Sequence, residues 1–400
     1  MKTILRGTRA LLPEGIRQTQ VIVEENRILD VTDHTDPAPG DRVIPAEGLY
    51  LAPGFVDIHV HGGGGRSAMS GQAEDVIAMA NAHAQFGTTS ILPTTLAAPI
   101  PTLLQAVGGI RRAADLPCDA TILGAHLEGP CLSPVQSGAQ SPDDLKIPAE
   151  TDLTPLLDAW PGGIRMMGAA PELPGALALG DLLAGRGIVA SIAHSNATYD
   201  QVLSALSHGY CDVTHLYSSC SGLIRVHSYR IPGVIEAGLN LDELTVQVIA
   251  DGKHLPLSLL QLIYRCKGAE KIELITDGLE FAAGELQEGT VYRQLNGMET
   301  VYEDGVMKLL SRESFAGSVA TMHRCLRTMV SAGIPLVQAV RMASENPARR
   351  VGAAKKGRIA PGMDADLVLM DGELNIRMVV ARGRVIRDDS AASGQRVTLP

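Results

Sequence analysis

The sequence predicts an α/β protein built on a (β/α)8 barrel of the TIM type, with a small β-sandwich domain formed by both chain ends. Three observations point to this fold. Between about residues 54 and 348, short aliphatic or β-branched runs alternate with helical stretches, which is the pattern of parallel βα units. Strand-like segments without a helical period flank this region on both sides. The length of 400 residues suits one barrel with a modest extra domain.

The number of aliphatic runs decides the type of α/β fold, because eight βα units close into a barrel. The eight runs are Gly54–His61, Thr88–Thr94, Thr121–Glu128, Ile164–Ala170, Ile188–His194, Tyr210–His215, Thr245–Asp251 and Lys271–Asp277. The helices are clearest at Ala73–Phe86, Tyr199–Ser207 and Leu336–Glu345. Thr198 with Gln201 suits a capping box, Gly87 suits the position after a helix, and Pro335 suits the first position within one.

The two ends of the chain are expected to pair in one β domain. Near the start, Gln20–Glu24 and Arg42–Pro45 read as short strands, and after Gly357 three more follow at Asp366–Met370, Asn375–Val380 and Arg382–Ile386. We therefore assign residues 1–53 and 349–400 to a discontinuous β-sandwich and residues 54–348 to a catalytic barrel.

Composition narrows the class of protein. The formal net charge of −10 and the 3% aromatic content argue against binding of nucleic acid. Arg6 and Arg9 interrupt any apolar run at the start, so we expect no signal peptide, no membrane partner and a cytoplasmic location. The six cysteines lack C-x-x-C spacing and are expected to be buried, reduced thiols.

Residues that commonly bind metals end five of the eight runs, where a (β/α)8 barrel places its active site. His59 and His61 are two residues apart and so point to the same side of a strand. Taken alone, this pair is equally consistent with two structural histidines and with two metal ligands. Glu128 ends another run, where an unpaired carboxylate is costly, and it could bridge two metal ions.

Three further candidates follow other runs. His194 and His215 would each be an ordinary core residue if alone, but two at equivalent strand ends favour a metal site. Asp277 could cap a helix, or it could act as a ligand and a proton shuttle. The mixed nitrogen and oxygen set suits Zn²⁺, Fe²⁺ or Mn²⁺ better than Ca²⁺.

Such a site predicts hydrolysis of an amide. A divalent cation would lower the pKa of water to about 7 and polarise a carbonyl group. Asp277 would accept the proton from the attacking water and deliver it to the leaving amine.

At these residues the chain resembles the N-acetylglucosamine-6-phosphate deacetylases of the amidohydrolase superfamily, over nearly its whole length. The matching segments, in the family's order, are LAPGFVDIHVHG, HLEGP, SIAHSNATYDQ, THLY, IPGVIEAGL, IADGKH, ITDG, FAGS, ASENPAR and GRIAPGMDADLVLMD. The resemblance implies that Glu128, His194 and His215 bind one metal and that Asp277 is the catalytic acid and base. Its H-x-H pair suggests a second ion, so we expect two divalent cations per subunit, Zn²⁺ first and Fe²⁺ or Mn²⁺ as alternatives.

The resemblance also implies a substrate site and a homodimer whose subunits approach each other's pockets. Arg230 corresponds to the arginine that holds the 6-phosphate, and an Arg can form paired bonds to phosphate oxygens. The other implied substrate contacts are Ala139, Gln140, Ser218, Ser219, His254, Phe315, Ala316 and Gly317.

The chain departs from the family pattern on the substrate side. Ser218-Ser219 stands where relatives carry Asn-Ala, and Gln140 replaces a histidine that touches the substrate. The longer loop before Arg230 brings Arg225 and His227, which could contact phosphate or simply be solvated. Deacetylation of N-acetylglucosamine 6-phosphate is the expected reaction, and N-acetylgalactosamine 6-phosphate stays open as the substrate.

Three rival functions share this fold. A cyclic-amide hydrolase such as a dihydroorotase would need a bridging lysine on the fourth strand, but that run ends in GAAPE. A non-catalytic scaffold tends to lose its ligands, and here the set is intact. A sugar-phosphate sensor would bind without releasing acetate, so measurement of acetate would distinguish it from an enzyme.

Overall fold

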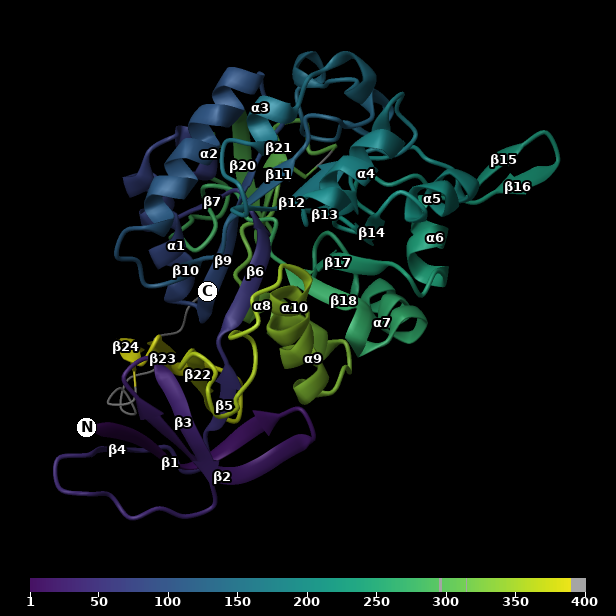
Figure 1. The fold of residues 1–400 in the computed structure, drawn as a ribbon. Coiled ribbons are helices and arrows are strands. Elements are labelled where there is room, and N and C mark those ends of the chain that lie inside the picture. The colour runs from purple at the N-terminus through teal and green to yellow at the C-terminus, as the bar shows by residue number, and fades with distance from the viewer. Residues whose placement is uncertain (295–296, 314, 390–400) are drawn as a thin grey trace.

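The computed structural model describes residues 1–294, 297–313 and 315–389. Its larger part is a parallel β-barrel surrounded by helices, and below the barrel in Figure 1 lies a second β-sheet made from both chain ends. The predicted (β/α)8 barrel with an additional β domain is therefore confirmed. Within the described ranges, no helix combines the length and apolar character needed to cross a membrane.

Eight parallel strands form the barrel, and they coincide with the eight predicted runs. Each strand is nearly or fully buried, because one face lines the barrel interior and the other packs against helices. The strands are β6 (Phe55–Val60), β9 (Thr88–Thr95), β11 (Ala125–Glu128), β12 (Ile164–Ala169), β13 (Val189–Ile192), β14 (Tyr210–Val213), β17 (Thr245–Ile249) and β18 (Ile272–Ile275). The third run is split, since Gly124 at φ +146° separates β11 from the short β10 (Thr121–Ile122).

The barrel closes between β18 and β6 at the carboxyl ends of these strands. The backbone N–H of Asp277 donates to the carbonyl of His59 at 2.9 Å, and the N–H of His61 donates to the carbonyl of Gly278 at 2.8 Å. The seam of the barrel therefore fixes three of the predicted site residues relative to one another.

Helices pack around the barrel, and several begin or end as the sequence predicts. Thr198 and Gln201 form the expected capping box, and Gly87 follows the first helix at φ +86°. Pro335 differs from the prediction, because its ψ of 135° makes it the cap before the helix and not the first helical residue. The helices are α1 (Ala73–Ala84), α2 (Ile100–Ala114), α3 (Thr154–Leu157), α4 (Ala176–Gly185), α5 (Tyr199–Leu206), α6 (Val234–Asn240), α7 (Leu257–Lys267), α8 (Met322–Ser331), α9 (Leu336–Ala343) and α10 (Glu345–Arg350).

The second sheet joins eight strands in one continuous ladder with its own hydrophobic core. Its centre is β1 (Lys2–Leu12), which pairs with β4 (Arg42–Pro45) along its first half and with β5 (Tyr50–Pro53) along its second half. An irregularity between Leu5 and Thr8 allows this change of partner. The other strands are β2 (Gly15–Glu24), β3 (Arg27–Thr32), β22 (Leu367–Met370), β23 (Ile376–Ala381) and β24 (Arg384–Asp388).

Two small β-sheets that extend from the barrel are not predicted from the sequence. The segment before α6 is a hairpin of β15 (Ile224–Val226) and β16 (Tyr229–Ile231), which projects away from the barrel (Figure 1). After β18, an antiparallel sheet of β19 (Val291–Arg293), β20 (Glu299–Glu303) and β21 (Val306–Leu309) follows. Both are too short to show a clear alternation. The small remaining elements are β7 (Gly62–Gly63), β8 (Arg66–Ser67) and the 3-10 turns Ala68–Ser70, Pro134–Gln136, Pro142–Asp144, Pro148–Glu150 and Ala269–Lys271.

The cysteines are all free, as expected from their spacing. The prediction that they are all buried is wrong for two of them. Cys266 is exposed because it lies on the outer face of α7, and Cys211 is half-buried near the base of the barrel.

One buried lysine connects the two sheets. The ammonium of Lys356 contacts the carboxylates of Asp366 and Asp364 at 2.7 and 2.8 Å, and it donates to the Thr121 hydroxyl of β10 at 2.9 Å. Because Asp366 directly precedes β22, this contact fixes the second sheet against the barrel.

We expect Lys356→Met to lower the free energy of unfolding by about 3–5 kcal/mol, because it leaves buried carboxylates without their cation. Urea unfolding followed by circular dichroism measures the effect. The exposed neighbour Lys355 provides a matched control, and Lys355→Met should change stability by less than about 0.5 kcal/mol. Equal effects of the two substitutions would contradict the role given to Lys356.

Candidate metal centre

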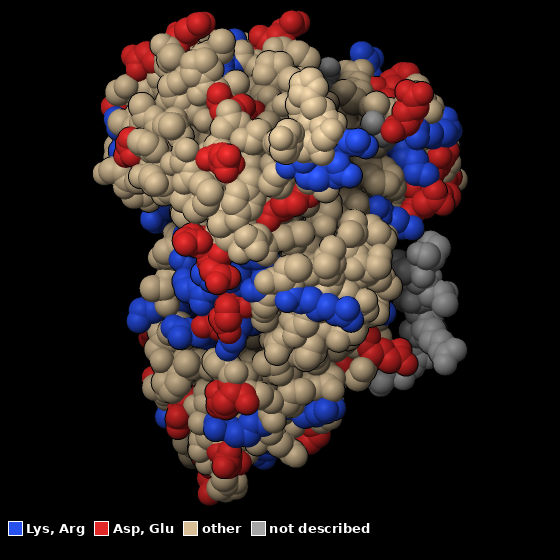
Figure 2. All heavy atoms as spheres, turned by 90° about the vertical axis from the view of Figure 1, so that its right-hand side faces the viewer, with Lys and Arg blue, Asp and Glu red and all other residues tan. Residues whose placement is uncertain are grey.

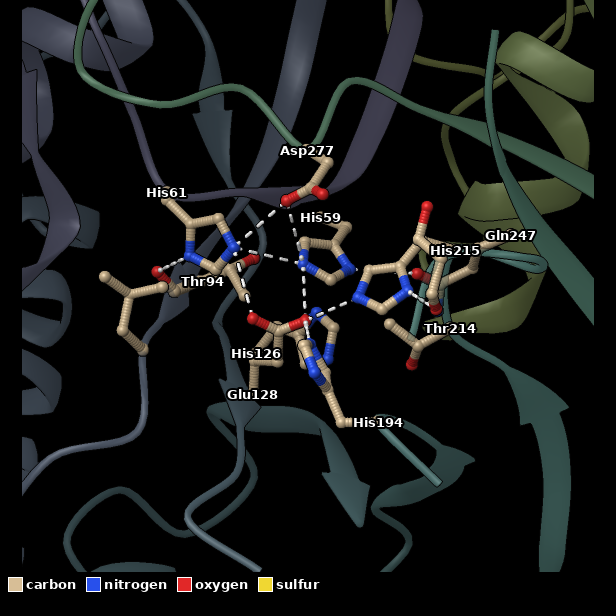
Figure 3. Close-up of polar contacts among 12 residues, drawn as sticks. His59, His61, Thr94, His126, Glu128, His194, Thr214, His215, Gln247 and Asp277 are labelled. Atoms are coloured by element: carbon tan, nitrogen blue, oxygen red, sulfur yellow. Dashed lines mark hydrogen bonds and ion pairs between the residues drawn. The ribbon is translucent and has the colours of Figure 1, made fainter. Parts of the chain in front are cut away.

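Side chains from five barrel strands converge at the carboxyl end of the barrel (Figure 3). They comprise four imidazoles and two carboxylates, all within a few ångströms of one another. The members are His59 and His61 from β6, Glu128 from β11, His194 after β13, His215 after β14 and Asp277 after β18. The structure thus brings together all six residues that the sequence suggested as metal ligands.

Glu128 lies at the centre of this cluster. Its Oε1 atom is 3.3 Å from the Nε2 atoms of both His59 and His194 and 2.9 Å from that of His215. Its Oε2 atom is 3.4 Å from Nε2 of His61. The carboxylate therefore belongs to two possible metal-binding groups, one with His59 and His61 and one with His194 and His215.

Each imidazole has its Nδ1 atom beside a protein oxygen that can only accept a hydrogen bond. In a neutral ring, Nδ1 therefore carries the hydrogen and Nε2 presents a lone pair to the centre of the cluster. The pairs are His59 with Gln247 Oε1 at 3.1 Å, His61 with the Thr94 carbonyl at 3.1 Å, His194 with the Gln136 carbonyl at 2.8 Å and His215 with the Ser218 carbonyl at 3.1 Å.

This arrangement fits a cation and is unfavourable without positive charge. The Nε2 atoms of His59 and His61 lie 3.2 Å apart, so two lone pairs face each other beside two carboxylates. A divalent ion bound by nitrogen and oxygen donors satisfies all of these atoms at once. The donor set is the one that Zn²⁺, Fe²⁺ or Mn²⁺ prefers.

The electrostatics of the cluster keep its carboxylates ionised. Burial opposes ionisation of Glu128, but the imidazoles of His59 and His194 hold its pKa well below the usual range. Burial likewise opposes ionisation of Asp277, yet His59 and His61 lower its pKa to about 2. For His61, burial alone would lower the pKa, whereas Asp277 and Glu128 raise it to about 10. The cluster therefore attracts positive charge.

Three of the six residues have unusual backbone geometry. His194, His215 and Asp277 have positive φ values of 43°, 27° and 48°, and each follows the end of a barrel strand. Such values cost a residue with a side chain on the order of 1 kcal/mol or more, and strained conformations of this kind often cluster at active sites. The turn conformation directs these side chains over the barrel mouth.

Two buried residues behind the cluster escaped sequence reasoning. Gln247 of β17 accepts from His59 through Oε1, and its Nε2 donates to Asp212 Oδ2 at 2.6 Å. Asp212 also accepts from the hydroxyls of Ser191 and Thr245, both at 2.7 Å. A glutamine inside the otherwise apolar strand TVQVI, and an aspartate inside YCDV, were the available signals.

Two residues on the same strand faces as the ligands lie outside the cluster. The carboxyl of Asp57 accepts from the Thr276 hydroxyl at 2.5 Å, and burial raises the pKa of Asp57 to about 6. The Nδ1 atom of His126 pairs with the carbonyl of Ile58 at 3.1 Å. Both side chains therefore bond to neighbouring strands deeper in the barrel.

Some of the predicted substrate contacts lie beside the cluster. The carbonyl of Ser218 orients His215, and Ser219 follows it at φ +49°. Ala139 is exposed, but the next side chain, Gln140, is buried and donates to Glu128 at 2.6 Å. Gln140, predicted as a substrate contact, thus bonds to the central carboxylate and to the backbone N–H of Ala97.

A second set of predicted contacts gathers near the end of β17. The ring of His254 lies 4.9 Å from the ring of Phe315, and its Nδ1 atom is 2.7 Å from Asp251 Oδ2. Phe315 is partly exposed, and Ala316 and Gly317 are the next two residues in the chain. An aromatic surface and a polar ring edge are therefore held side by side.

Arg230 is the one predicted site residue that the fold sets apart. It lies on β16, where it is exposed. Figure 1 shows that the hairpin of β15 and β16 projects away from the barrel. Arg225 is its cross-strand partner, and the hairpin also exposes Ile224, Val226 and Tyr229. Within one chain, the hairpin does not contribute to the cluster of imidazoles.

Comparison with known proteins assigns the chain to a family. The Amidohydrolase family model matches residues 50–386. The N-acetylglucosamine-6-phosphate deacetylase of Lysinibacillus sphaericus is 30% identical, over 92% of this chain and 93% of that protein. The N-acetylgalactosamine-6-phosphate deacetylase of Escherichia coli O157:H7 is 31% identical, over 96% of this chain and 99% of that protein.

Solved structures agree with this assignment. The N-acetyl-D-glucosamine-6-phosphate deacetylase of Mycobacterium smegmatis superimposes with a TM-score of 0.85 at 32% identity, over 97% of this chain and 100% of the other. A point mutant of that enzyme, in complex with N-acetyl-D-glucosamine-6-phosphate, gives the same TM-score of 0.85 at 31% identity, over 96% of this chain and 99% of that one. The chain therefore belongs to the amidohydrolase family and, within it, to the N-acetylglucosamine-6-phosphate deacetylase family.

Proposed function

We propose that the protein hydrolyses the acetamide of N-acetylglucosamine 6-phosphate to glucosamine 6-phosphate and acetate. The observation that carries this proposal is the convergence of four imidazole lone pairs and two carboxylates at the barrel mouth. Relatives with this activity in their names cover nearly the whole chain at about 30% identity. Two divalent cations per subunit fit the two donor groups that share Glu128, with Zn²⁺ as the first choice and Fe²⁺ or Mn²⁺ as alternatives.

We assign the proton transfer to Asp277. Its side chain is 18% exposed, whereas those of the other five cluster residues are at most 7% exposed. Its low pKa keeps it ionised at neutral pH, so it can accept a proton from water. A divalent cation held by the imidazoles and Glu128 would, when bound, activate the water and polarise the acetyl carbonyl. As the C–N bond breaks, Asp277 returns the proton to the amine nitrogen.

The identity of the sugar has one specific alternative. A relative named as an N-acetylgalactosamine-6-phosphate deacetylase is as similar as those named for the glucosamine sugar. Ser218, Ser219 and Gln140 also differ from the family pattern on the substrate side. We therefore keep N-acetylgalactosamine 6-phosphate as the second candidate substrate.

We further propose a homodimer in which each hairpin reaches the pocket of the other subunit. Arg230 is exposed and remote from the cluster of its own chain, and large apolar side chains surround it on the hairpin. Figure 2, seen from the side where the hairpin projects, shows uncharged surface with Lys and Arg side chains beside it and with Asp and Glu side chains on the same face, and the exposed apolar residues of the hairpin are Ile224, Val226 and Tyr229. Apolar surface with adjacent positive charge suits an interface that also binds phosphate.

A cytoplasmic location completes the proposal. All six cysteines are free thiols, as is usual in a reducing compartment.

A panel of N-acetylated hexosamines, with and without a 6-phosphate, tests the proposed reaction. After reconstitution with each divalent metal, we expect stoichiometric acetate and free amine from a 6-phosphorylated N-acetylhexosamine, fastest with the glucosamine form. Binding without release of acetate would make the protein a sensor. Faster turnover of N-acetylgalactosamine 6-phosphate would select the alternative substrate.

Asp277→Asn should lower kcat by about 10²–10⁴, because an amide cannot accept the proton while the shape of the pocket is preserved. Substrate affinity and metal content should stay close to those of the wild type. Steady-state kinetics and elemental analysis of the purified variant measure both. Unchanged turnover would remove Asp277 from the proton transfer, and lost metal would make it chiefly a ligand.

Arg230→Ala should raise KM for the phosphorylated sugar by about 10–100-fold, as expected for loss of a charge-assisted hydrogen bond. The unphosphorylated sugar should be affected much less. Arg225→Ala, at the paired position on β15, removes the same charge from the same hairpin, and an unchanged KM in that variant would assign the phosphate contact to Arg230 alone. Equal losses for both sugars would rule out phosphate recognition by Arg230.

The same variants test the arrangement between subunits. Neither Asp277→Asn nor Arg230→Ala protein should be fully active alone. If Arg230 acts on the neighbouring pocket, refolding the two variants together should restore part of the activity, because a mixed dimer contains one complete site. No recovery from confirmed mixed dimers would place Arg230 within its own subunit's site.

A further inference from the structure

The side chain of Gln140 bonds at both ends inside the protein. Its Oε1 atom accepts from the backbone N–H of Ala97 at 2.9 Å, and its Nε2 atom donates to Glu128 Oε2 at 2.6 Å. A backbone N–H can only donate, so the contact with Ala97 fixes which end of the amide faces Glu128. Gln140 is only 7% exposed, and its position therefore depends on these two contacts.

The oxygen that Gln140 contacts is the one that lies beside His61 of the first metal-binding group, whereas His59 of that group lies 3.3 Å from Oε1. Glu128 Oε2 lies nearest to His61, whereas Oε1 lies nearest to His215 and close to His194. The carboxylate serves both groups only when its two oxygens point in these two directions. A rotation of the carboxylate about its own axis would draw Oε2 away from His61.

We propose that Gln140 is a positioning residue that holds Glu128 as a bridge between two cation sites. The proposal deepens the proposed function and rests on it, because it concerns the same metal-dependent reaction. A carboxylate oxygen has a second lone pair, so Oε2 can accept from Gln140 and still bind a cation. Partners of this kind orient metal ligands, and their loss typically weakens metal affinity by about 10–100-fold.

The loop that carries Gln140 also holds a second cluster residue. The carbonyl of Gln136 accepts from His194 Nδ1 at 2.8 Å. Gly138, at φ +58°, packs so tightly that an added Cβ atom would lie 2.6 Å from Ser219 Oγ and 3.3 Å from His194 Cε1. The segment 136–140 thus contacts both His194 and the carboxylate of Glu128. Its close packing against His194 fixes the position of the Gln140 backbone.

A purely structural role for Gln140 makes a different prediction. If the side chain only satisfied the buried N–H of Ala97, its removal would lower stability and leave the metal stoichiometry unchanged. If it holds the bridge, its removal should chiefly affect the ion that needs Oε2. Metal content and metal–metal coupling therefore separate the two roles, and neither measurement depends on the sugar assay.

The variant Gln140→Met tests this role, because methionine keeps the length of the side chain and removes both polar atoms. We expect wild-type protein to bind two Mn²⁺ ions per chain and to give the paramagnetic resonance spectrum of a coupled pair. Gln140→Met should keep one tight ion, bind the second about 10–100-fold more weakly, and lose the coupled signal. Gln140→His should retain two ions, since its ring N–H can still donate to Glu128.

Gln20→Met is the control for loss of a buried amide, because Gln20 is equally buried but lies in β2 of the other sheet. It should bind two ions as the wild type does. Should Gln140→Met not fold, Gln140→Asn replaces it, since the shorter amide cannot keep both contacts. Two ions at wild-type affinity in the folded Gln140 variant, or one ion in the wild type, would overturn the proposal. Acetate release distinguishes the proposed reaction from the proposed role of Gln140. A wild-type protein that binds two ions but releases no acetate would contradict the reaction and not the role of Gln140.

Discussion

The centre of this structure depends on the direction of four imidazole rings. Each Nδ1 atom meets an oxygen that can only accept, so each neutral ring directs a lone pair inward. The four oxygens come from different parts of the chain, namely the end of β9, the loop at 136–140, the turn after β14 and the strand β17. His215 meets Ser218 within a single turn, but the other three contacts join residues at least 33 positions apart in the chain, so the ability to bind a cation depends on the whole fold.

The barrel also supplies the energy that holds strained ligands in place. His194, His215 and Asp277 have positive φ values, which an isolated loop would not maintain. Asp277 is held because its own N–H completes the seam between β18 and β6. His194 is held between the Gln136 carbonyl and the close approach of Gly138. The rigid strands before each residue and the packed loops after it leave one conformation for the side chain.

The sequence predicts the six candidate metal ligands but not the buried residues that orient them, and the reason is geometric. His59 and His61 lie on one face because side chains alternate along a strand, and all six donors lie at strand ends that meet in a barrel. Gln247 and Asp212 look like isolated polar residues within apolar strands, and their link to His59 exists only across three strands of the barrel. The sequence indicates only a longer loop where the projecting hairpin lies, because strands of three residues are too short to show an alternation of apolar and polar residues.

The position of Gln140 bears on how the sugar is selected. Its Oε1 is occupied by Ala97, and one of its two Nε2 hydrogens is directed at Glu128, so at most one donor remains for a hydroxyl group of the substrate. A residue whose amide is bonded to Ala97 and Glu128 in this way would contribute more to the metal centre than to recognition of the sugar ring. Under the proposed function, discrimination between epimers would fall to other polar groups near the mouth, such as the Ser218 and Ser219 hydroxyls and the ring of His254. We therefore propose separate roles for the departures from the family pattern: Gln140 would set the geometry of the bridge, and Ser218 and Ser219 would set the fit of the sugar.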